Sequence, residues 1–255
     1  MKGMSGKVLA ITSGKGGVGK TIFATNLAGV YHHLKKKVLV IDMDLSCGGV
    51  AVLLNLTNSK TIYNLADDIL NNRFKDSREY VYHYSEYIDI LPSCTDPRQG
   101  NRIDLKIIEQ IITLYKNSYD VIILDTSHIP TSYTLESLDI ADKVLFMITD
   151  NLLDLKNSSS FLSILSDIKE DNLYVILNNS SHTLKNYFSK FDIKNIIKHN
   201  IDYILPSSMY VNNINKYLME GHILVLNNNL SFKNKSDSEL LIKIAKDMVG
   251  EQDEK

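Results

Sequence analysis

The sequence has little of what would indicate a secreted, membrane-spanning or metal-cluster protein. Among 255 residues only Cys47 and Cys94 are cysteines, and their separation predicts neither a disulfide framework nor a paired metal site. No apolar run approaches the roughly 18 residues of a membrane span, and no signal peptide precedes the first apolar segment. We therefore expect a cytoplasmic protein.

Neither sign of charge is in excess. The chain has 28 basic and 30 acidic residues, a formal charge of −2, which argues against a protein that coats nucleic acid but is compatible with a local basic patch. The most basic cluster, residues 35–37, is expected to end a helix rather than to bind DNA. No proline-rich linker or repeat divides the chain, so residues 1–255 are expected to form one domain.

The most informative segment is a glycine-rich loop at residues 14–21. It fits the pattern G-x-x-x-x-G-K-[ST] and lies between an apolar strand pattern at 8–12 and a helical pattern at 22–34. Because glycines let the backbone approach phosphate oxygens and a helix N-terminus attracts anions, this context predicts a nucleotide site. We expect Lys20 to reach the β- and γ-phosphates of ATP and the Thr21 hydroxyl to bind Mg²⁺. The expected phosphate-binding residues are Gly14, Lys15, Gly16, Gly17, Val18, Gly19, Lys20 and Thr21.

Apolar segments alternate with helical patterns along the rest of the chain. Strands are expected at 37–42, 87–91, 119–125, 143–148, 173–177 and 201–205, and helices at 104–115, 153–168 and 236–249. Unbroken apolar strands separated by helices predict an α/β fold, with a mostly parallel twisted sheet covered by helices on both faces. Residues 57–86 lack this regularity and are expected to form short helices at the sheet edge.

Acidic residues stand at the ends of two of these strands. Asp42 and Asp44 follow the second strand, and Asp125 follows four apolar residues, which is the Walker B arrangement. Parallel sheets bind ligands at the carboxyl ends of their strands. We therefore expect Asp125 to hold Mg²⁺ through a water and Asp42 to support the metal. The alternative is that these aspartates only cap strands or helices.

One residue of the glycine-rich loop narrows the interpretation. The run KGGVGKT at 15–21, in which Lys15 lies among glycines, resembles the deviant Walker A loop of the MinD/ParA ATPases. The resemblance implies ATP hydrolysis and a nucleotide-sandwich homodimer, in which Lys15 crosses to the partner subunit's nucleotide. It also places Asp44 at the family's switch I aspartate, the best candidate for orienting the attacking water. Without the resemblance, Lys15 is an ordinary solvated lysine.

The same resemblance places the nucleobase over the later strands. Asn178 is expected to read adenine, because a side-chain amide offers both a donor and an acceptor to that edge. Pro206 lies in a loop whose backbone is expected to contact the base. Asn179 is an alternative one position away, and both asparagines are compatible with ordinary turns.

Softer similarities concern the branch of the family. Residues 38–54, 90–92, 154–157 and 205–221 resemble the TadZ/CpaE branch of pilus-assembly ATPases, and the flagellar-number regulator FlhG shares much of this pattern. The resemblance implies a switch that positions or recruits a pilus or secretion apparatus, brought to the membrane or pole through a protein partner. Alternatives are a MinD/FlhG-like spatial regulator, a ParA-type DNA-segregation ATPase and, because Cys47 lies beside switch I, a cluster carrier of the nitrogenase iron-protein type.

Three features depart from this branch. The chain starts at its first strand, where TadZ/CpaE proteins usually carry a receiver-like domain. Thr126 and Ser127 follow Asp125 where a proline is more common, so hydrolysis is expected to be slow. Residues 246–255 lack a basic amphipathic face like that of MinD's membrane-targeting helix, so we expect no direct membrane insertion by this route. The charge balance predicts no strong DNA binding.

Overall fold

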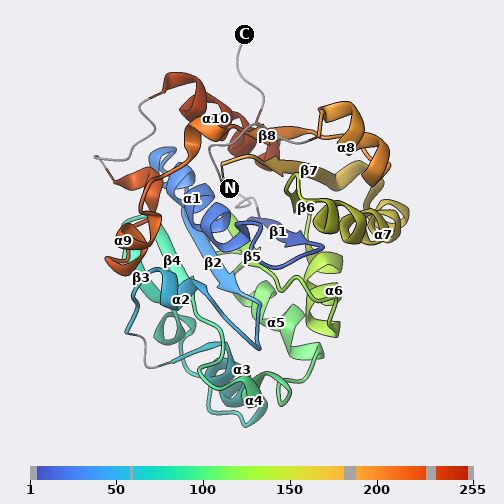
Figure 1. Ribbon diagram of the computed structural model, residues 1–255. Coiled ribbons are helices and arrows are strands. Elements are labelled where there is room, and N and C mark those ends of the chain that lie inside the picture. Colours follow the sequence, from blue (N-terminus) through green and yellow to red (C-terminus); the bar gives the residue numbers. More distant parts are fainter. Residues whose placement is uncertain (1–4, 58–59, 181–187, 228–233, 252–255) are drawn as a thin grey trace.

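The computed structural model describes residues 5–57, 60–180, 188–227 and 234–251 (Figure 1). Its centre is an eight-stranded sheet with the strand order β3-β4-β2-β5-β1-β6-β7-β8. Every neighbouring pair is parallel except β3 and β4. This confirms the predicted α/β fold. The strands are β1 (Lys7–Ser13), β2 (Val38–Asp42), β3 (Tyr82–Ser85), β4 (Ile88–Leu91), β5 (Val121–Asp125), β6 (Lys143–Ile148), β7 (Leu173–Asn178) and β8 (Tyr203–Leu205).

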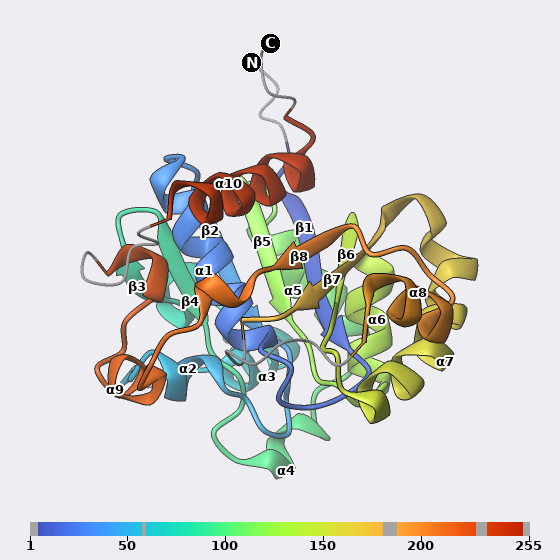
Figure 2. The ribbon, with the colours of Figure 1, turned by 45° about the horizontal axis from the view of Figure 1, so that its top comes forward.

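Helices cover both faces of the sheet (Figures 1 and 2). One core lies beneath α1, α10 and the short α2, and the other lies beneath α3, α5, α6, α7 and α8. The α-helices are α1 (Lys20–His33), α2 (Val50–Leu53), α3 (Ile62–Leu70), α4 (Pro97–Gly100), α5 (Lys106–Tyr115), α6 (Ser132–Ile140), α7 (Leu152–Lys169), α8 (Lys190–Ile197), α9 (Ile214–Met219) and α10 (Lys235–Val249). Short 3₁₀ turns are η1 (Ser77–Tyr80), η2 (Glu170–Asn172), η3 (Ser207–Met209) and η4 (Leu224–Leu226).

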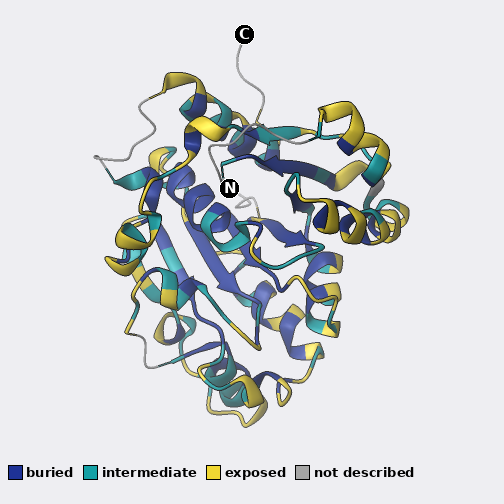
Figure 3. Ribbon diagram, in the orientation of Figure 1, coloured by how far each residue is buried: buried dark blue, intermediate teal, exposed yellow. Residues whose placement is uncertain are grey.

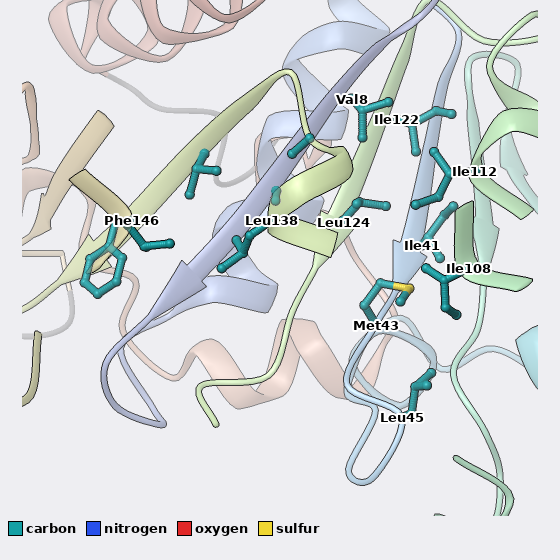
Figure 4. Packing of buried hydrophobic residues seen from close by; sticks show 14 of the residues in the cluster. Val8, Ile41, Met43, Leu45, Ile108, Ile112, Ile122, Leu124, Leu138 and Phe146 are labelled. Carbon is teal, nitrogen blue, oxygen red and sulfur yellow. The ribbon is translucent and has the colours of Figure 1, made fainter. Parts of the chain in front are cut away.

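The central strands are apolar throughout because both of their faces are buried. In β1, Leu9 and Ile11 face the core under α1, whereas Val8 and Ala10 face the opposite core. Figure 4 shows part of this second core, where sheet side chains such as Ile122 pack beside Ile112 of α5. Colouring by burial shows the same pattern, with a buried sheet inside helices whose outer faces are exposed (Figure 3).

The predicted strands and helices all appear, with ends that differ by a few residues. The expectation for residues 57–86 was incomplete, because α3 and η1 are followed by the strand β3, which pairs antiparallel with β4. β3 is a four-residue edge strand with no buried residue, and its register shifts between His83 and Ser85. The sequence of β3 therefore has no alternation of buried apolar residues that would predict a strand. Its strand conformation comes from pairing with β4.

Two expectations concern membranes and the C-terminus. No helix among the described residues is long and apolar enough to cross a membrane. The C-terminal helix α10 ends at Val249. We expect no membrane-targeting helix in residues 246–255, and the last four of these residues, 252–255, lie outside the described residues.

Candidate functional site

The glycine-rich loop joins the end of β1 to the start of α1, at the carboxyl edge of the sheet (Figure 1). Gly17 and Gly19 have φ values of 80° and 99°, a left-handed conformation that favours glycine. A Cβ atom on Gly14 would lie 2.8 Å from the backbone nitrogen of Ser158, and one on Gly19 would lie 2.8 Å from Nδ2 of Asn178. Both close approaches and both turns therefore depend on the glycines that the motif specifies.

Lys20 is the first residue of α1 and is half-buried beside the loop. Its Nζ donates to Oγ of Ser13 at 3.0 Å, and that hydroxyl donates to the backbone oxygen of Lys15 at 2.7 Å. Burial lowers the pKa of Lys20, while the nearby carboxylates of Asp125 and Asp44 act in the opposite direction. A phosphate group at this loop would add negative charge beside the ammonium, whose hydrogen bond is to Ser13.

Thr21 and Asp125 form the part of the site that fits a magnesium ion. The Thr21 hydroxyl donates to Oδ2 of Asp125 at 2.6 Å. Asp125 is buried, and its Oδ1 has no hydrogen-bond partner within the described part of the chain. Burial raises the pKa of Asp125 to about 6, against the opposing effects of the Thr21 hydroxyl and the Lys20 ammonium. Such an unpaired carboxylate oxygen beside a threonine hydroxyl suits Mg²⁺, which prefers oxygen ligands and keeps several waters.

Asp42 lies beside Asp125, because the two residues are in register across β2 and β5. Its side chain is fully buried, and each carboxylate oxygen accepts a backbone N–H: Oδ1 from Asp44 at 3.2 Å and Oδ2 from Val50 at 3.0 Å. Burial, followed by the charge of Asp125, raises the pKa of Asp42 well above its usual range. In the structure, Asp42 thus holds the loop between β2 and α2 through these two hydrogen bonds. Its support of the metal stays a prediction.

Asp44 is partly exposed in that same loop. Its Oδ1 accepts the backbone N–H of Cys47 at 3.1 Å, and its backbone oxygen accepts the Ser93 hydroxyl at 2.8 Å. Its charge acts on both Lys20 and Asp125. The fold therefore brings Lys20, Asp44 and Asp125 close together, and their roles in ATP hydrolysis stay predictions.

Lys15 is half-buried at the rim of the loop. Its ammonium forms no hydrogen bond or ion pair among the residues that the structure describes, although its charge reaches the buried carboxyl of Asp154. Burial raises the pKa of Asp154, and this carboxyl accepts hydrogen bonds from Thr149 and Ser158. Asp154 is not among the residues that the sequence predicts for the site. Residues 154–157 are noted there only for their similarity to the TadZ/CpaE branch, and an acidic residue in the first turn of a helix is also what an ordinary helix start contains.

A cavity of about 240 Å³ adjoins the glycine-rich loop on the α1 side of the sheet. Asn178 lies on its wall, but the side chain is already engaged: Nδ2 donates to the Val18 oxygen at 2.8 Å, and Oδ1 accepts from Ser180. Pro206 precedes η3, where its carbonyl accepts the N–H of Met209. The lining residues include Gly17, Val18, Gly19, Ile22, Phe23, Asn26, Asn178, Leu205, Met209 and Tyr210. The cavity adjoins the phosphate loop, and the contacts of Asn178 and Pro206 with a nucleobase stay predictions.

The cysteines do not gather with other metal ligands. In the described ranges, no three histidine, cysteine or acidic side chains form a group that could hold a metal by themselves. Cys47 is exposed, and burial raises the pKa of the half-buried Cys94 to about 11. A magnesium ion at Thr21 and Asp125 would therefore depend on the phosphates of its nucleotide for further ligands.

The sequence pattern of a known family, described as an AAA domain, matches residues 6–176. The chain belongs to this AAA domain family. The matched region contains the glycine-rich loop, Asp44 and Asp125.

Individual relatives place this AAA domain among the MinD/ParA-type P-loop ATPases. An uncharacterized ATP-binding protein of Methanocaldococcus jannaschii is 28% identical over 145 residues, which is 57% of this chain and 54% of that protein. The septum site-determining protein MinD of Bacillus subtilis is 26% identical over 201 residues, which is 76% of this chain and 72% of that protein. The crystal structure of a ParA family ATPase from Chlorobium tepidum shares the fold, with a TM-score of 0.79 at 20% identity over 94% of this chain and 98% of that one.

Proposed function

We propose that this ATPase is a dimerisation switch that ATP turns on and its own hydrolysis turns off. The observation that carries the proposal is the position of Lys15. It lies in the glycine-rich loop, yet the cation next to the expected phosphate site is Lys20, and Lys15 forms no ion pair within the described residues. A loop lysine that its own subunit does not use is available to a second subunit.

A two-fold dimer makes use of such a residue twice. If the loops of two subunits face each other, each Lys15 supplies one cation to the nucleotide of the other subunit. The contact between ammonium and γ-phosphate exists only while that phosphate is present, and it is strengthened by the exclusion of water. Hydrolysis then weakens the interface and releases whatever the dimer holds.

The chemistry of the reset step follows from the site. Lys20 neutralises the β- and γ-phosphates of bound ATP, Thr21 and Asp125 hold Mg²⁺, and Asp44 orients the attacking water. Bound Mg²⁺ supplies positive charge at the phosphates. Because Thr126 and Ser127 occupy the segment after Asp125, the reset is slow, and the dimer persists long enough to recruit a partner.

The partner is a protein of a pilus or secretion apparatus, as in the TadZ/CpaE branch. Support comes from the sequence similarity of residues 38–54 and 205–221 to that branch. Through this partner the ATPase reaches the membrane or the cell pole. The second candidate is a MinD/FlhG-like spatial regulator, which the 26% identity to a MinD protein favours. The two candidates are distinguished by identifying the proteins that the ATP-bound Asp44→Ala variant captures and Lys15→Ala does not. Components of a pilus or secretion apparatus would favour the first candidate, and other partners would favour the second.

Lys15→Ala should retain ATP binding but lose ATP-induced dimerisation. The side chain forms no hydrogen bond or ion pair among the described residues, so its removal leaves the subunit intact. Multi-angle light scattering on the Asp44→Ala background, with ATP and Mg²⁺, measures the mass. With Lys15 present the mass should rise from 28.9 kDa toward twice that value, and without it the mass should stay unchanged. The matched control is Lys243→Ala, an exposed lysine of α10. Equal dimerisation with and without Lys15 would show an ordinary loop lysine.

Duplex DNA of random sequence should bind weakly at about 0.15 M salt, because non-specific affinity comes mainly from neutralised phosphates. The basic cluster 35–37 follows α1, and Lys36 in it already pairs with Glu251 at 2.6 Å. Fluorescence anisotropy with and without ATP measures the affinity across a salt series. Tight, ATP-dependent binding with a steep salt dependence would instead favour the ParA-type DNA-segregation function.

A further inference from the structure

The loop that carries Asp44 is held in place by a residue from a distant part of the sequence. Asp44 lies between β2 and α2, and Ser93 lies two residues beyond β4. β4 pairs with β2, so the two loops leave the same edge of the sheet side by side. The Ser93 hydroxyl is buried there and donates to the backbone oxygen of Asp44 at 2.8 Å. The backbone of the expected water-orienting residue is thus fixed from outside its own loop.

Gly48 is a second residue of the same loop that lies close to Ser93. A Cβ atom on Gly48 would lie 2.3 Å from Cβ of Ser93 and 2.9 Å from Oδ2 of Asp42. Neither distance is tolerated by a real side chain, so the loop reaches this position only because residue 48 is glycine. The glycine is required by close approach, not by an unusual backbone angle.

Asp42 completes the restraint from the other side. Its two carboxylate oxygens accept the N–H groups of Asp44 and Val50, at the two ends of the loop. Asp44 therefore has its backbone N–H held by Asp42 and its backbone oxygen held by Ser93. Both backbone groups of Asp44 are therefore fixed by residues outside the loop, and its carboxylate is held in turn by the N–H of Cys47.

We infer that Ser93 is a positioning residue for ATP hydrolysis, acting through the backbone of Asp44. The inference rests on the proposed role of Asp44 as the group that orients the attacking water. Among the described residues, the Ser93 hydroxyl donates to the backbone oxygen of Asp44 and forms no hydrogen bond with the phosphate loop or with Asp125. A small displacement of a water-orienting group lowers the rate of the chemical step without lowering the affinity for ATP.

Ser93→Ala tests this by separating hydrolysis from binding. The single-turnover rate of ATP hydrolysis should fall about tenfold, the effect of roughly one lost hydrogen bond, while the dissociation constant for ATP stays within about twofold. The matched control is Thr95→Ala in the same segment, because the Thr95 hydroxyl contacts Gln99 and not the Asp44 loop. It should hydrolyse ATP at the wild-type rate. Gly48→Ala would place a methyl group between the Asp44 loop and Ser93. This variant should also hydrolyse ATP more slowly while it still binds ATP.

A double-mutant comparison decides whether the effect passes through Asp44. On the Asp44→Ala background, Ser93→Ala should cause no further loss, because the group it positions is already absent. An equal tenfold loss on both backgrounds, or a parallel loss of ATP affinity, would overturn the inference and give Ser93 an ordinary structural role. Normal hydrolysis by Asp44→Ala would contradict the proposed role of Asp44 itself. Normal hydrolysis by Ser93→Ala, with slow hydrolysis by Asp44→Ala, would contradict only the role inferred for Ser93.

Discussion

Lys20→Ala is expected to lower the affinity for ATP by about 100-fold or more, which is effectively a loss of binding. Lys20 is the cation closest to the expected phosphates, and its hydrogen bond to Ser13 holds it against the glycine-rich loop. Each charge-assisted hydrogen bond to a phosphate contributes about 1.5–3 kcal/mol, and this lysine faces two phosphates. Without it, Asp44 and Asp125 would repel the incoming nucleotide with no opposing charge from Lys20. Isothermal titration calorimetry with ATP and Mg²⁺ measures the loss.

The fold should survive this substitution. Burial lowers the pKa of Lys20, so the protein already holds this ammonium at an electrostatic cost, and removing it relieves that cost. Thermal unfolding in the absence of nucleotide should therefore occur near the wild-type temperature. Lys243→Ala serves as the control for loss of a lysine elsewhere, and its affinity for ATP should not change. Wild-type affinity in Lys20→Ala would remove the phosphate-loop assignment.

Asp44→Ala is expected to bind ATP normally and to hydrolyse it more slowly, by about 10²-fold or more. Asp44 lies near enough to Lys20 and Asp125 for its charge to act on both, but its carboxylate accepts a hydrogen bond from Cys47 within the loop that follows β2. Loss of a group that orients or deprotonates water commonly has an effect of this size on the chemical step. Single-turnover hydrolysis, with ATP binding measured in parallel, separates the two quantities.

Asp44→Asn is the matched variant for this prediction. An asparagine can still accept the Cys47 N–H, so it preserves the loop and removes only the charge. If the carboxylate acts on water, Asp44→Asn should be nearly as slow as Asp44→Ala. A rate close to wild type in Asp44→Asn would mean that residue 44 matters for the shape of the loop, and unchanged hydrolysis in both variants would assign the reaction to another group.

Much of the site could be predicted because its signals are local. The glycine-rich loop specifies its own turns, because its glycines include the two loop residues with positive φ values, Gly17 and Gly19. The strand that ends at Asp125 is recognisable from four apolar residues, since a central parallel strand is buried on both faces. The carboxyl ends of parallel strands share one edge of the sheet, which predicts that Asp44 and Asp125 lie at the same edge.

The residues that the sequence did not identify act through neighbours distant in the chain. Nothing in the sequence near Ser93 indicates a role, because its contact with the backbone of Asp44 arises only when β4 pairs with β2. Asp154 is one acidic residue in a helix until Gly14 packs against Ser158 beneath the loop. Asn178 has the amide expected of a base contact, yet the fold directs that amide to the Val18 oxygen.

The sequence by itself determined the α/β fold, the phosphate loop and the aspartates at the strand ends, because each depends on residue types that are consecutive or regularly spaced. Tertiary structure alone decided the strand order that sets Asp42 beside Asp125, the edge strand β3, and the restraint of Asp44 by Ser93. The reason is physical. Periodicity records which face of an element is buried, but it contains no information on which other element buries that face.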